Sequence, residues 1–238
     1  MNTFNGHTVR GLLIDVGGTL RPNRMALLPG DEEDRAARVA AELPLHREEA
    51  ASLVAYASQV SGDAEGRLSQ TTDPLIAGWL RAHGIEPETG LVIRLRRALA
   101  LSAVGRVRLY EGAAELLSES RRRGLRTVLL SNVDFRDETV YREEFEAAGV
   151  AGALDGIVTS VDVGLRKPLP AIFRAALGVA GTEPSETVMI GNSERSDIVP
   201  ASTLGLGTIL VAIDDPVPAR TRADAMVTSL REIPPLLG

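Results

Sequence analysis

Residues 9–20 read VRGLLIDVGGTL, and the fold can be worked out from this stretch. From Val9 to Val16 the stretch is mostly apolar, which is typical of a buried parallel strand. Two glycines and a threonine follow and predict a tight turn. Asp15 therefore stands at the carboxyl end of the strand, where α/β proteins place functional side chains.

Short apolar or β-branched runs recur later in the chain, and a helical segment separates each from the next. The predicted strands are residues 125–130, 156–161, 187–190 and 208–213. The predicted helices are residues 111–123, 137–148 and 168–177, each followed by a glycine suited to a helix end. This alternation predicts an α/β fold with a doubly wound, Rossmann-like parallel sheet covered by helices on both faces.

Residues 21–105 interrupt this alternation. The segment is rich in Ala, Arg, Glu and Leu and shows no convincing strand. Asp73 and Pro74 predict a helix start, and Gly84 a helix end, within a group of three or four helices. We therefore expect an all-helical cap domain at 21–105, inserted after the first strand, and an α/β core domain formed by 1–20 and 106–238.

Four polar clusters follow predicted strands of the core. Because the carboxyl ends of the strands meet at one crevice in a doubly wound sheet, side chains far apart in sequence are expected to converge there. The clusters are Asp15, Ser131 with Asn132, Lys167, and residues 191–193 with Asp197.

In order and spacing, these clusters resemble the four motifs of the haloacid dehalogenase-like hydrolase superfamily. Residues 13–20 resemble motif I, residues 130–132 motif II, residues 164–168 motif III and residues 190–201 motif IV. The resemblance covers most of the chain from Val9 to Ile213. The helical insertion is similar to the cap of the family's first cap class.

The resemblance implies a magnesium-dependent phosphatase that acts on a small phosphorylated metabolite. Asp15 would be the nucleophile and form a covalent intermediate. The groups that stabilise the transferred phosphoryl group would be Ser131, Asn132, Lys167 and the amide of Gly18. The Mg²⁺ ligands would be Asp15, the Gly17 carbonyl, Asn192 and Asp197.

Two residues depart from the family pattern. Gly17 stands where most family phosphatases carry a second aspartate, a general acid and base whose loss removes a factor of about 10²–10⁴ in rate. Asn192 stands where many relatives carry a metal-binding aspartate, so weaker Mg²⁺ binding is expected. Alkyl phosphates should therefore be poor substrates, unless the cap or the substrate supplies the proton.

Other readings of the same residues stay open. A metal-independent dehalogenase would use Asp15 to displace halide and would need no acid at Gly17. A catalytically quiet relative would use the crevice or the cap for binding alone. The Gly-Gly-Thr string is also similar to sugar kinases of the actin-like fold, but 238 residues are few for two lobes, and that resemblance leaves Lys167 unexplained.

Composition limits the cellular context and the partners. The chain has no cysteine, which excludes disulfides and favours the cytoplasm. It lacks a secretory leader and any apolar run of about 18 residues, so no membrane association is expected. The net charge of −6 disfavours nucleic acid as a partner and leaves a small-molecule substrate. Substrate identity and oligomeric state do not follow from the sequence.

Overall fold

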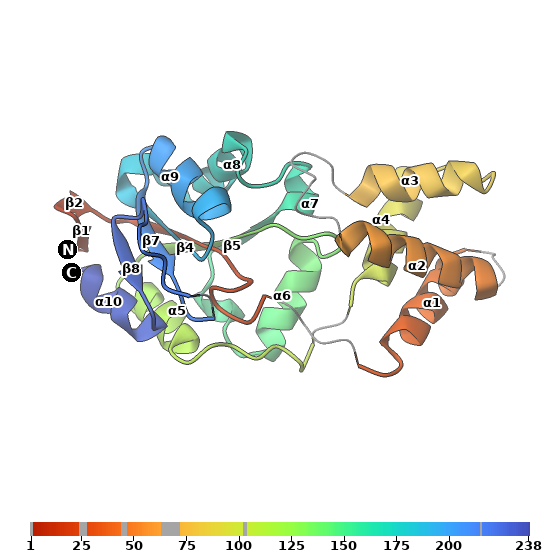
Figure 1. Cartoon of the computed structure of the whole chain (residues 1–238), viewed down its shortest axis with the longest axis horizontal. Coiled ribbons are helices and arrows are strands. Elements are labelled where there is room, and N and C mark those ends of the chain that lie inside the picture. The colour runs from red at the N-terminus through yellow and green to blue at the C-terminus, as the bar shows by residue number, and fades with distance from the viewer. Residues whose placement is uncertain (1, 24–27, 44–46, 63–71, 102–103, 215) are drawn as a thin grey trace.

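The computed structural model describes residues 2–23, 28–43, 47–62, 72–101, 104–214 and 216–238. At its centre is a six-stranded sheet in the order β5-β4-β3-β6-β7-β8, with every neighbouring pair parallel (Figure 1). The strands are β3 Gly11–Ile14, β4 Arg126–Ser131, β5 Gly156–Thr159, β6 Thr187–Gly191, β7 Gly207–Val211 and β8 Ala225–Val227. The predicted α/β class with a parallel sheet is confirmed.

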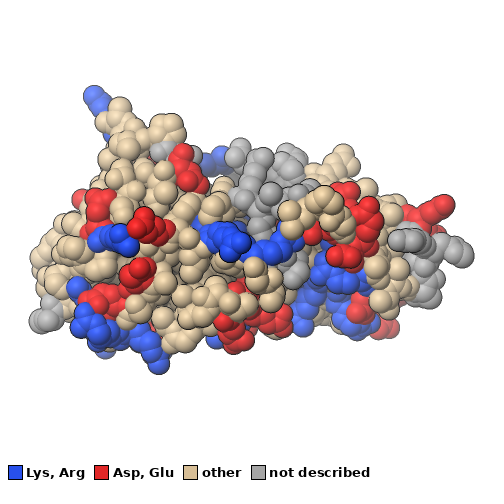
Figure 2. Space-filling view, turned by 90° about the horizontal axis from the view of Figure 1, so that it is seen from below, with Lys and Arg blue, Asp and Glu red and all other residues tan. Residues whose placement is uncertain are grey.

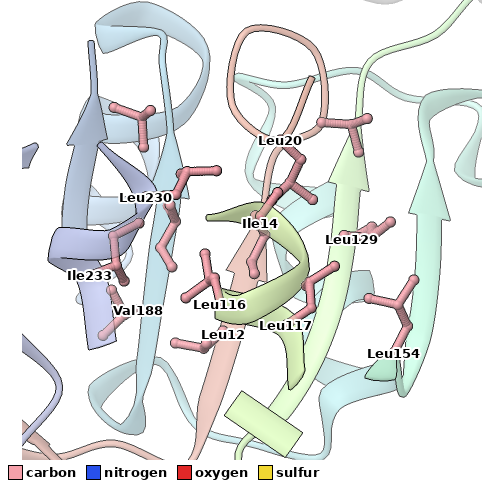
Figure 3. Packing of buried hydrophobic residues seen from close by; sticks show 14 of the residues in the cluster. Leu12, Ile14, Leu20, Leu116, Leu117, Leu129, Leu154, Val188, Leu230 and Ile233 are labelled. Carbon is pink, nitrogen blue, oxygen red and sulfur yellow. The ribbon is translucent and has the colours of Figure 1, made fainter. Parts of the chain in front are cut away.

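Helices cover both faces of this sheet, because the side chains of each strand alternate between them. Leu12 and Ile14 pack in one hydrophobic cluster and Leu13 packs in the other. Leu116 and Leu117 lie against the first of these faces (Figure 3). The helices on that side are α5 Ala113–Arg122, α6 Glu138–Ala147 and α10 Ile233–Leu236, and those on the other are α8 Pro170–Ala180 and α9 Val199–Thr203.

Several elements differ from the sequence prediction. Strand β8 and the hairpin of β1 Thr3–Phe4 with β2 His7–Thr8 are only two or three residues long, too short to show a period. Helix α8 runs past Gly178 because Ala180 is buried on the sheet, and it ends at Gly181, which has a φ of 67°. Strand β5 stops at Thr159, whose hydroxyl accepts from Asp162 N and caps the short helix α7 Ser160–Val163.

The segment between β3 and α5 contains four helices among its described residues. They are α1 Asp31–Glu42, α2 Arg47–Gly62, α3 Thr72–Ala82 and α4 Thr89–Leu99, and they lie at one end of the molecule (Figure 1). They bury a hydrophobic cluster separate from the two beside the sheet. Helix α3 begins before Asp73, which therefore lies in the first turn rather than at the N-cap.

The chain leaves the sheet region at Leu20 and returns at Tyr110, whose amide donates to the Leu20 carbonyl at 2.8 Å. The separate hydrophobic cluster of the four helices, and the hydrogen bond that joins the two ends of the segment, agree with a helical unit inserted after β3. The division of the chain at residues 20/21 and 105/106 stays a prediction. No helix in the described ranges is long and apolar enough to cross a bilayer.

The loop after β4 joins the four helices to the sheet. Asp137 caps α6 by accepting from Val140 N, and its Oδ2 also accepts from Arg96 and Arg97 of α4, at 3.1 and 2.7 Å. Burial raises the pKa of Asp137, but the hydrogen bonds from Arg97, the Val140 amide and Arg96 outweigh it and lower the pKa below 3.8. Phe135 packs against the cluster of the four helices.

Candidate active site

Asp15 follows β3 directly and is held at the carboxyl edge of the sheet. Its amide donates to the Ile190 carbonyl at 2.9 Å, which continues the pairing of β3 with β6. The residue is 7% exposed. One carboxylate oxygen, Oδ1, accepts from Lys167 Nζ at 2.6 Å, and the other, Oδ2, accepts from Thr19 Oγ1 at 3.1 Å.

Lys167 uses all three of its ammonium hydrogens within the site. Its Nζ donates to Asp15 Oδ1, to Asp197 Oδ1 at 2.7 Å and to the Leu130 carbonyl at 2.9 Å. Burial by itself would lower the pKa of Lys167, but the charges of the two carboxylates outweigh it and raise the pKa to about 12. The side chain is therefore a fixed cation between two carboxylates.

Asp197 completes this ion triad from the short π-helical turn η4 Glu194–Ile198, which follows β6. Its Oδ2 accepts from Ser193 N at 3.0 Å. A Cβ atom on Gly191 would lie 2.5 Å from the Asp197 carboxylate, so only glycine fits at the end of β6. Burial raises the pKa of Asp197 to about 6, with Lys167 lowering it and Asp15 raising it further.

Asn132 holds the backbone of Lys167. Its Nδ2 donates to the Lys167 carbonyl at 2.9 Å, and its Oδ1 accepts from the Lys167 amide at 2.8 Å. Ser131 Oγ shares a hydrogen bond with Tyr141 OH at 3.2 Å in the core. The side chains of Asn132 and Ser131 are thus engaged with protein groups, and their predicted contact with a phosphoryl group stays a prediction.

The turn after Asp15 is closed by its own backbone. Gly18 N donates to the Arg21 carbonyl at 2.7 Å, so this amide, predicted to bind substrate, already has an acceptor. Gly18 has a φ of 77°, and a Cβ atom there would lie 2.3 Å from Asn192 Nδ2. The second glycine of the turn is therefore required both by its conformation and by the packing of Asn192.

Thr19 and Arg21 of this turn were not among the predicted site residues. Thr19 binds the Asp15 carboxylate, and its place four residues after the carboxylate within motif I was an available signal. Arg21 is only 5% exposed, and its NH1 donates to the carbonyl of Pro22 at 3.3 Å, while its Nε has no hydrogen-bond partner among the described residues. No sequence pattern indicates that this arginine is buried.

The predicted Mg²⁺ ligands offer the donor atoms that the ion prefers, but their net negative charge is small. Two carboxylates, one amide oxygen and one backbone carbonyl are the hard oxygen donors that Mg²⁺ takes. Each oxygen of Asp15 accepts a single hydrogen bond, which leaves it a second lone pair. Lys167 reduces the charge of the two carboxylates to about −1, and no described group of three His, Cys, Asp or Glu is placed to hold a metal.

Charged side chains of both signs lie interleaved on the face of the molecule that Figure 2 presents. The net charge is −6, so an anionic substrate has to be attracted by local groups. Within the described site, Lys167 is the cation in direct contact with Asp15.

This arrangement of a buried Asp-Lys-Asp triad on a doubly wound sheet agrees with a family assignment. The family model of the haloacid dehalogenase-like hydrolases matches residues 9–205, and the chain belongs to this family. The superfamily predicted from the four motifs is thus confirmed.

Solved structures share the fold over nearly the whole chain. A 2-haloacid dehalogenase from Pseudomonas syringae pv. Tomato DC3000 has a TM-score of 0.61 at 18% identity and covers 97% of this chain and 98% of its own.

Similar curated proteins include phosphatases. Phosphoserine phosphatase of Thermus thermophilus is 34% identical over 129 residues, which are 52% of this chain and 49% of that protein. N-acylneuraminate-9-phosphatase of Homo sapiens is 30% identical over 132 residues, 54% of this chain and 52% of that protein. The chain thus spans about half the length of these relatives. A HAD phosphatase from Thermococcus onnurineus shares the fold, with a TM-score of 0.59, 18% identity and 97% and 98% of the two chains covered.

Proposed function

We propose that this chain is a phosphoric monoester hydrolase that uses Asp15 as its nucleophile on a small phosphorylated metabolite. The observation that carries the proposal is the contact of 2.6 Å between Asp15 Oδ1 and the buried ammonium of Lys167. A carboxylate that is paired with a fixed cation and oriented by the Thr19 hydroxyl is suited to attack phosphorus. The phosphatases among the similar proteins support this choice.

The reaction divides into two displacements at phosphorus. In the first, an oxygen of Asp15 forms a bond to phosphorus, the bond to the leaving oxygen breaks, and the leaving group departs with the electron pair. In the second, water attacks the phosphorus of the aspartyl phosphate, the bond to Asp15 breaks, and inorganic phosphate and a proton are released. Lys167 offsets negative charge at Asp15 in both steps.

Magnesium belongs to this proposal as a weakly held cofactor. Asp15, the Gly17 carbonyl, Asn192 and Asp197 would hold Mg²⁺, which supplies positive charge to an incoming phosphate dianion when it is bound. Lys167 already offsets one of the two carboxylate charges, and Asn192 adds none. Millimolar Mg²⁺ is therefore the expected requirement.

The leaving group is expected to depart without a proton. Residue 17 is glycine, so no carboxyl group stands two positions after Asp15. Acyl and aryl phosphates release stable anions and need little acid catalysis, whereas alkyl phosphates need a proton donor. We therefore assign the substrate to phosphate compounds with good leaving groups.

The test is hydrolysis of 4-nitrophenyl phosphate with and without millimolar Mg²⁺, for the wild type and for Asp15→Asn. Asp34→Asn is the matched control, because Asp34 is exposed on α1. We expect Mg²⁺-dependent release of phosphate in the wild type and the control, and a loss of at least about 10³-fold in Asp15→Asn. Turnover that survives in Asp15→Asn would contradict the proposal.

Displacement of halide from carbon is the second candidate. The observation in its favour is that Lys167 neutralises the charge of Asp15 without a metal ion. In addition, displacement of halide from carbon needs no acid at residue 17. Asp15 would form an ester with the substrate as halide leaves, and water would then hydrolyse the ester. Chloride release from 2-chloropropionate without added metal, lost in Asp15→Asn, would favour this reaction over phosphate transfer. Absence of both activities would indicate a relative that only binds its ligand.

A further inference from the structure

The backbone of Lys167 is held by the side chain of Asn132, which follows β4 directly. Asn132 Nδ2 donates to the Lys167 carbonyl at 2.9 Å, and Asn132 Oδ1 accepts from the Lys167 amide at 2.8 Å. An amide side chain that bonds the N–H and the C=O of one residue uses both its donor and its acceptor to fix that backbone. From this fixed backbone the Lys167 ammonium reaches Asp15 Oδ1 at 2.6 Å.

A second contact fixes the residue before the lysine. Arg166 NH1 donates to Asp134 Oδ1 at 2.9 Å and to the Val133 carbonyl at 3.2 Å. Arg166 is only 7% exposed, so the loss of Asp134 would leave a buried charge without its partner. Residues 132–134 therefore hold both Arg166 and the backbone of the lysine that follows it.

The same loop is held from the other side by the four-helix segment. Thr72, the first residue of α3, donates from its hydroxyl to the Asp134 carbonyl. Phe135 packs against the hydrophobic cluster of the four helices, with the Arg35 guanidinium carbon 5.9 Å from the centre of its ring. Asp137 accepts from two arginines of α4, at 3.1 and 2.7 Å. Contacts to the helices and to the lysine are thus joined by one short loop.

From these contacts we infer that the docking of α3 and α4 on residues 132–137 sets the position of the Lys167 ammonium, with Asn132 as the positioning residue. Coupling between distant groups passes through chains of hydrogen-bonded residues, and this chain runs without a gap from the helices to Asp15. The pairing of Asp15 with its cation thereby depends on contacts that lie several residues away. This dependence rests on the proposed function and adds to it a way in which the helices govern the rate.

Lys167 is the only lysine in the chain, so its signals can be observed alone. Protein labelled with ¹⁵N in lysine has a single labelled backbone amide in its NMR spectrum. That amide is the donor to Asn132 Oδ1. Its chemical shift and its rate of hydrogen exchange report on the contact with Asn132, whether or not the protein is active.

Three variants interrupt the chain of contacts at different points. Asn132→Ala removes both hydrogen bonds to the Lys167 backbone. Thr72→Val removes the hydroxyl that donates to the Asp134 carbonyl and keeps the shape of the side chain. Asp137→Asn removes the charge that faces α4, while its side-chain oxygen can still accept from the first turn of α6. The last two variants leave Asn132 and Lys167 unchanged.

The first measurement is the NMR signal of the Lys167 amide. In Asn132→Ala we expect the signal to shift and hydrogen exchange to become about tenfold faster, because the acceptor is lost. Thr72→Val and Asp137→Asn should shift the signal in the same direction by a smaller amount. Asp31→Asn is the matched control, because it breaks a different ion pair of the helices, at the start of α1, and it should leave the signal in place.

The second measurement is turnover of 4-nitrophenyl phosphate by the same variants. We expect kcat to fall at least about fivefold in Thr72→Val and Asp137→Asn and about 10²-fold in Asn132→Ala, because small displacements of an aligned group slow the chemical step. KM should change by less than about twofold, since substrate binding is not the step affected. The control Asp31→Asn should keep the wild-type kcat.

A Lys167 signal that stays at its wild-type position in both Thr72→Val and Asp137→Asn would overturn the inference, and so would an equal shift in Asp31→Asn. A shifted signal with an unchanged kcat would overturn the link from the helices to the rate. If the signal shifts as expected but the wild type releases no phosphate, the proposed function is wrong, while the coupling of the helices to Lys167 is confirmed.

Discussion

At the scale of single residues, Lys167 joins parts of the site that are far apart in the chain. Its ammonium contacts the carboxylates after β3 and β6, and it donates to the Leu130 carbonyl near the carboxyl end of β4. A buried cation that satisfies two carboxylates stabilises the fold only while all three charges are present. The site is therefore sensitive to the loss of any one of them.

Lys167→Met should destabilise the protein strongly at neutral pH. Two buried carboxylates would lose their cation, at a cost of about 3–5 kcal/mol in the free energy of unfolding. The pKa of Asp197 is already raised to about 6 by burial, and the loss of Lys167 would raise it further, so acid would protonate this carboxyl and reduce the repulsion. The difference in the free energy of unfolding between the wild type and Lys167→Met should thus shrink as the pH falls from about 8 to 5. Urea unfolding at several pH values measures this difference.

Asp197→Asn in the Lys167→Met background is the control for this prediction. It removes one of the two unpaired carboxylates, and we expect it to restore part of the lost stability near pH 7. A deficit that does not change with pH and is not relieved by the second substitution would show that the ion triad does not contribute as described.

Asn192→Asp should tighten Mg²⁺ binding. The two side chains have nearly the same shape, so the close packing of residue 192 against Gly18 is kept while one carboxylate charge is added to the predicted ligands. We expect the Mg²⁺ concentration for half-maximal activity to fall on the order of tenfold. A titration of activity against Mg²⁺ checks this, and an unchanged requirement would exclude residue 192 as a ligand.

At the scale of elements, the loop after β4 connects the site to the four-helix segment. Asn132 at its start binds the Lys167 backbone through both ends of its amide, and Arg166 donates to Asp134 Oδ1 at 2.9 Å. A few residues later Asp137 binds two arginines of α4. One loop thus positions the lysine of the site and also anchors the helices beside it.

Asp137→Asn should weaken this junction. The amide can still cap α6, but the charge facing Arg96 and Arg97 is lost, which we expect to cost about 2–3 kcal/mol at neutral pH. The pKa of Asp137 is below 3.8, so its contribution is present above that pH and disappears as the pH falls through the lower value in the folded protein. The free energies of unfolding of the wild type and of Asp137→Asn, measured with urea, should become equal only at strongly acidic pH.

Thr139→Val serves as the control for that junction, because Thr139 receives only a hydrogen bond of 3.3 Å from the exposed Arg97. It should change stability by less than about 1 kcal/mol. Equal effects of the two substitutions, or an Asp137→Asn deficit that persists at acidic pH, would contradict the role given to the Asp137 charge.

The same elements show how far sequence reasoning reaches. Strands β3, β4 and β6 have four to six mainly apolar residues, and they were predicted within two residues at each end. Strand β8 has three residues, and its place beside β7 depends on long-range packing that no local pattern records. Helix α8 ran past Gly178 because burial of Ala180 outweighs the weak helix propensity of glycine.

The sequence predicted which residues meet at the candidate site, but not which hydrogen bonds they form there. The order of the motifs was enough to bring Asp15, Lys167 and Asp197 to one edge of the sheet, and the structure places them in direct contact. That Asn132 binds the Lys167 backbone, and that the Gly18 amide is used by Arg21, depends on loop conformations that spacing does not fix.

At the scale of the whole molecule, the sheet explains why distant residues form one site. Strand β3 lies between β4 and β6, so the carboxyl ends that carry Ser131, Asp15 and Gly191 stand side by side. The four helices α1–α4 are inserted directly after the Asp15 turn and return beside it at Tyr110. We expect this segment to shape substrate access, while the reacting groups stay on the sheet.

The most direct measurement is to identify the covalent intermediate on Asp15. The protein is denatured with acid during steady turnover of 4-nitrophenyl phosphate and Mg²⁺, treated with borohydride, and analysed by peptide mass spectrometry. We expect the residue at position 15 to be converted to homoserine, the product of reduction of an aspartyl phosphate, and the Asp15→Asn variant to show no conversion. Turnover in the wild type without any modification at residue 15 would contradict the assignment of Asp15 as the nucleophile.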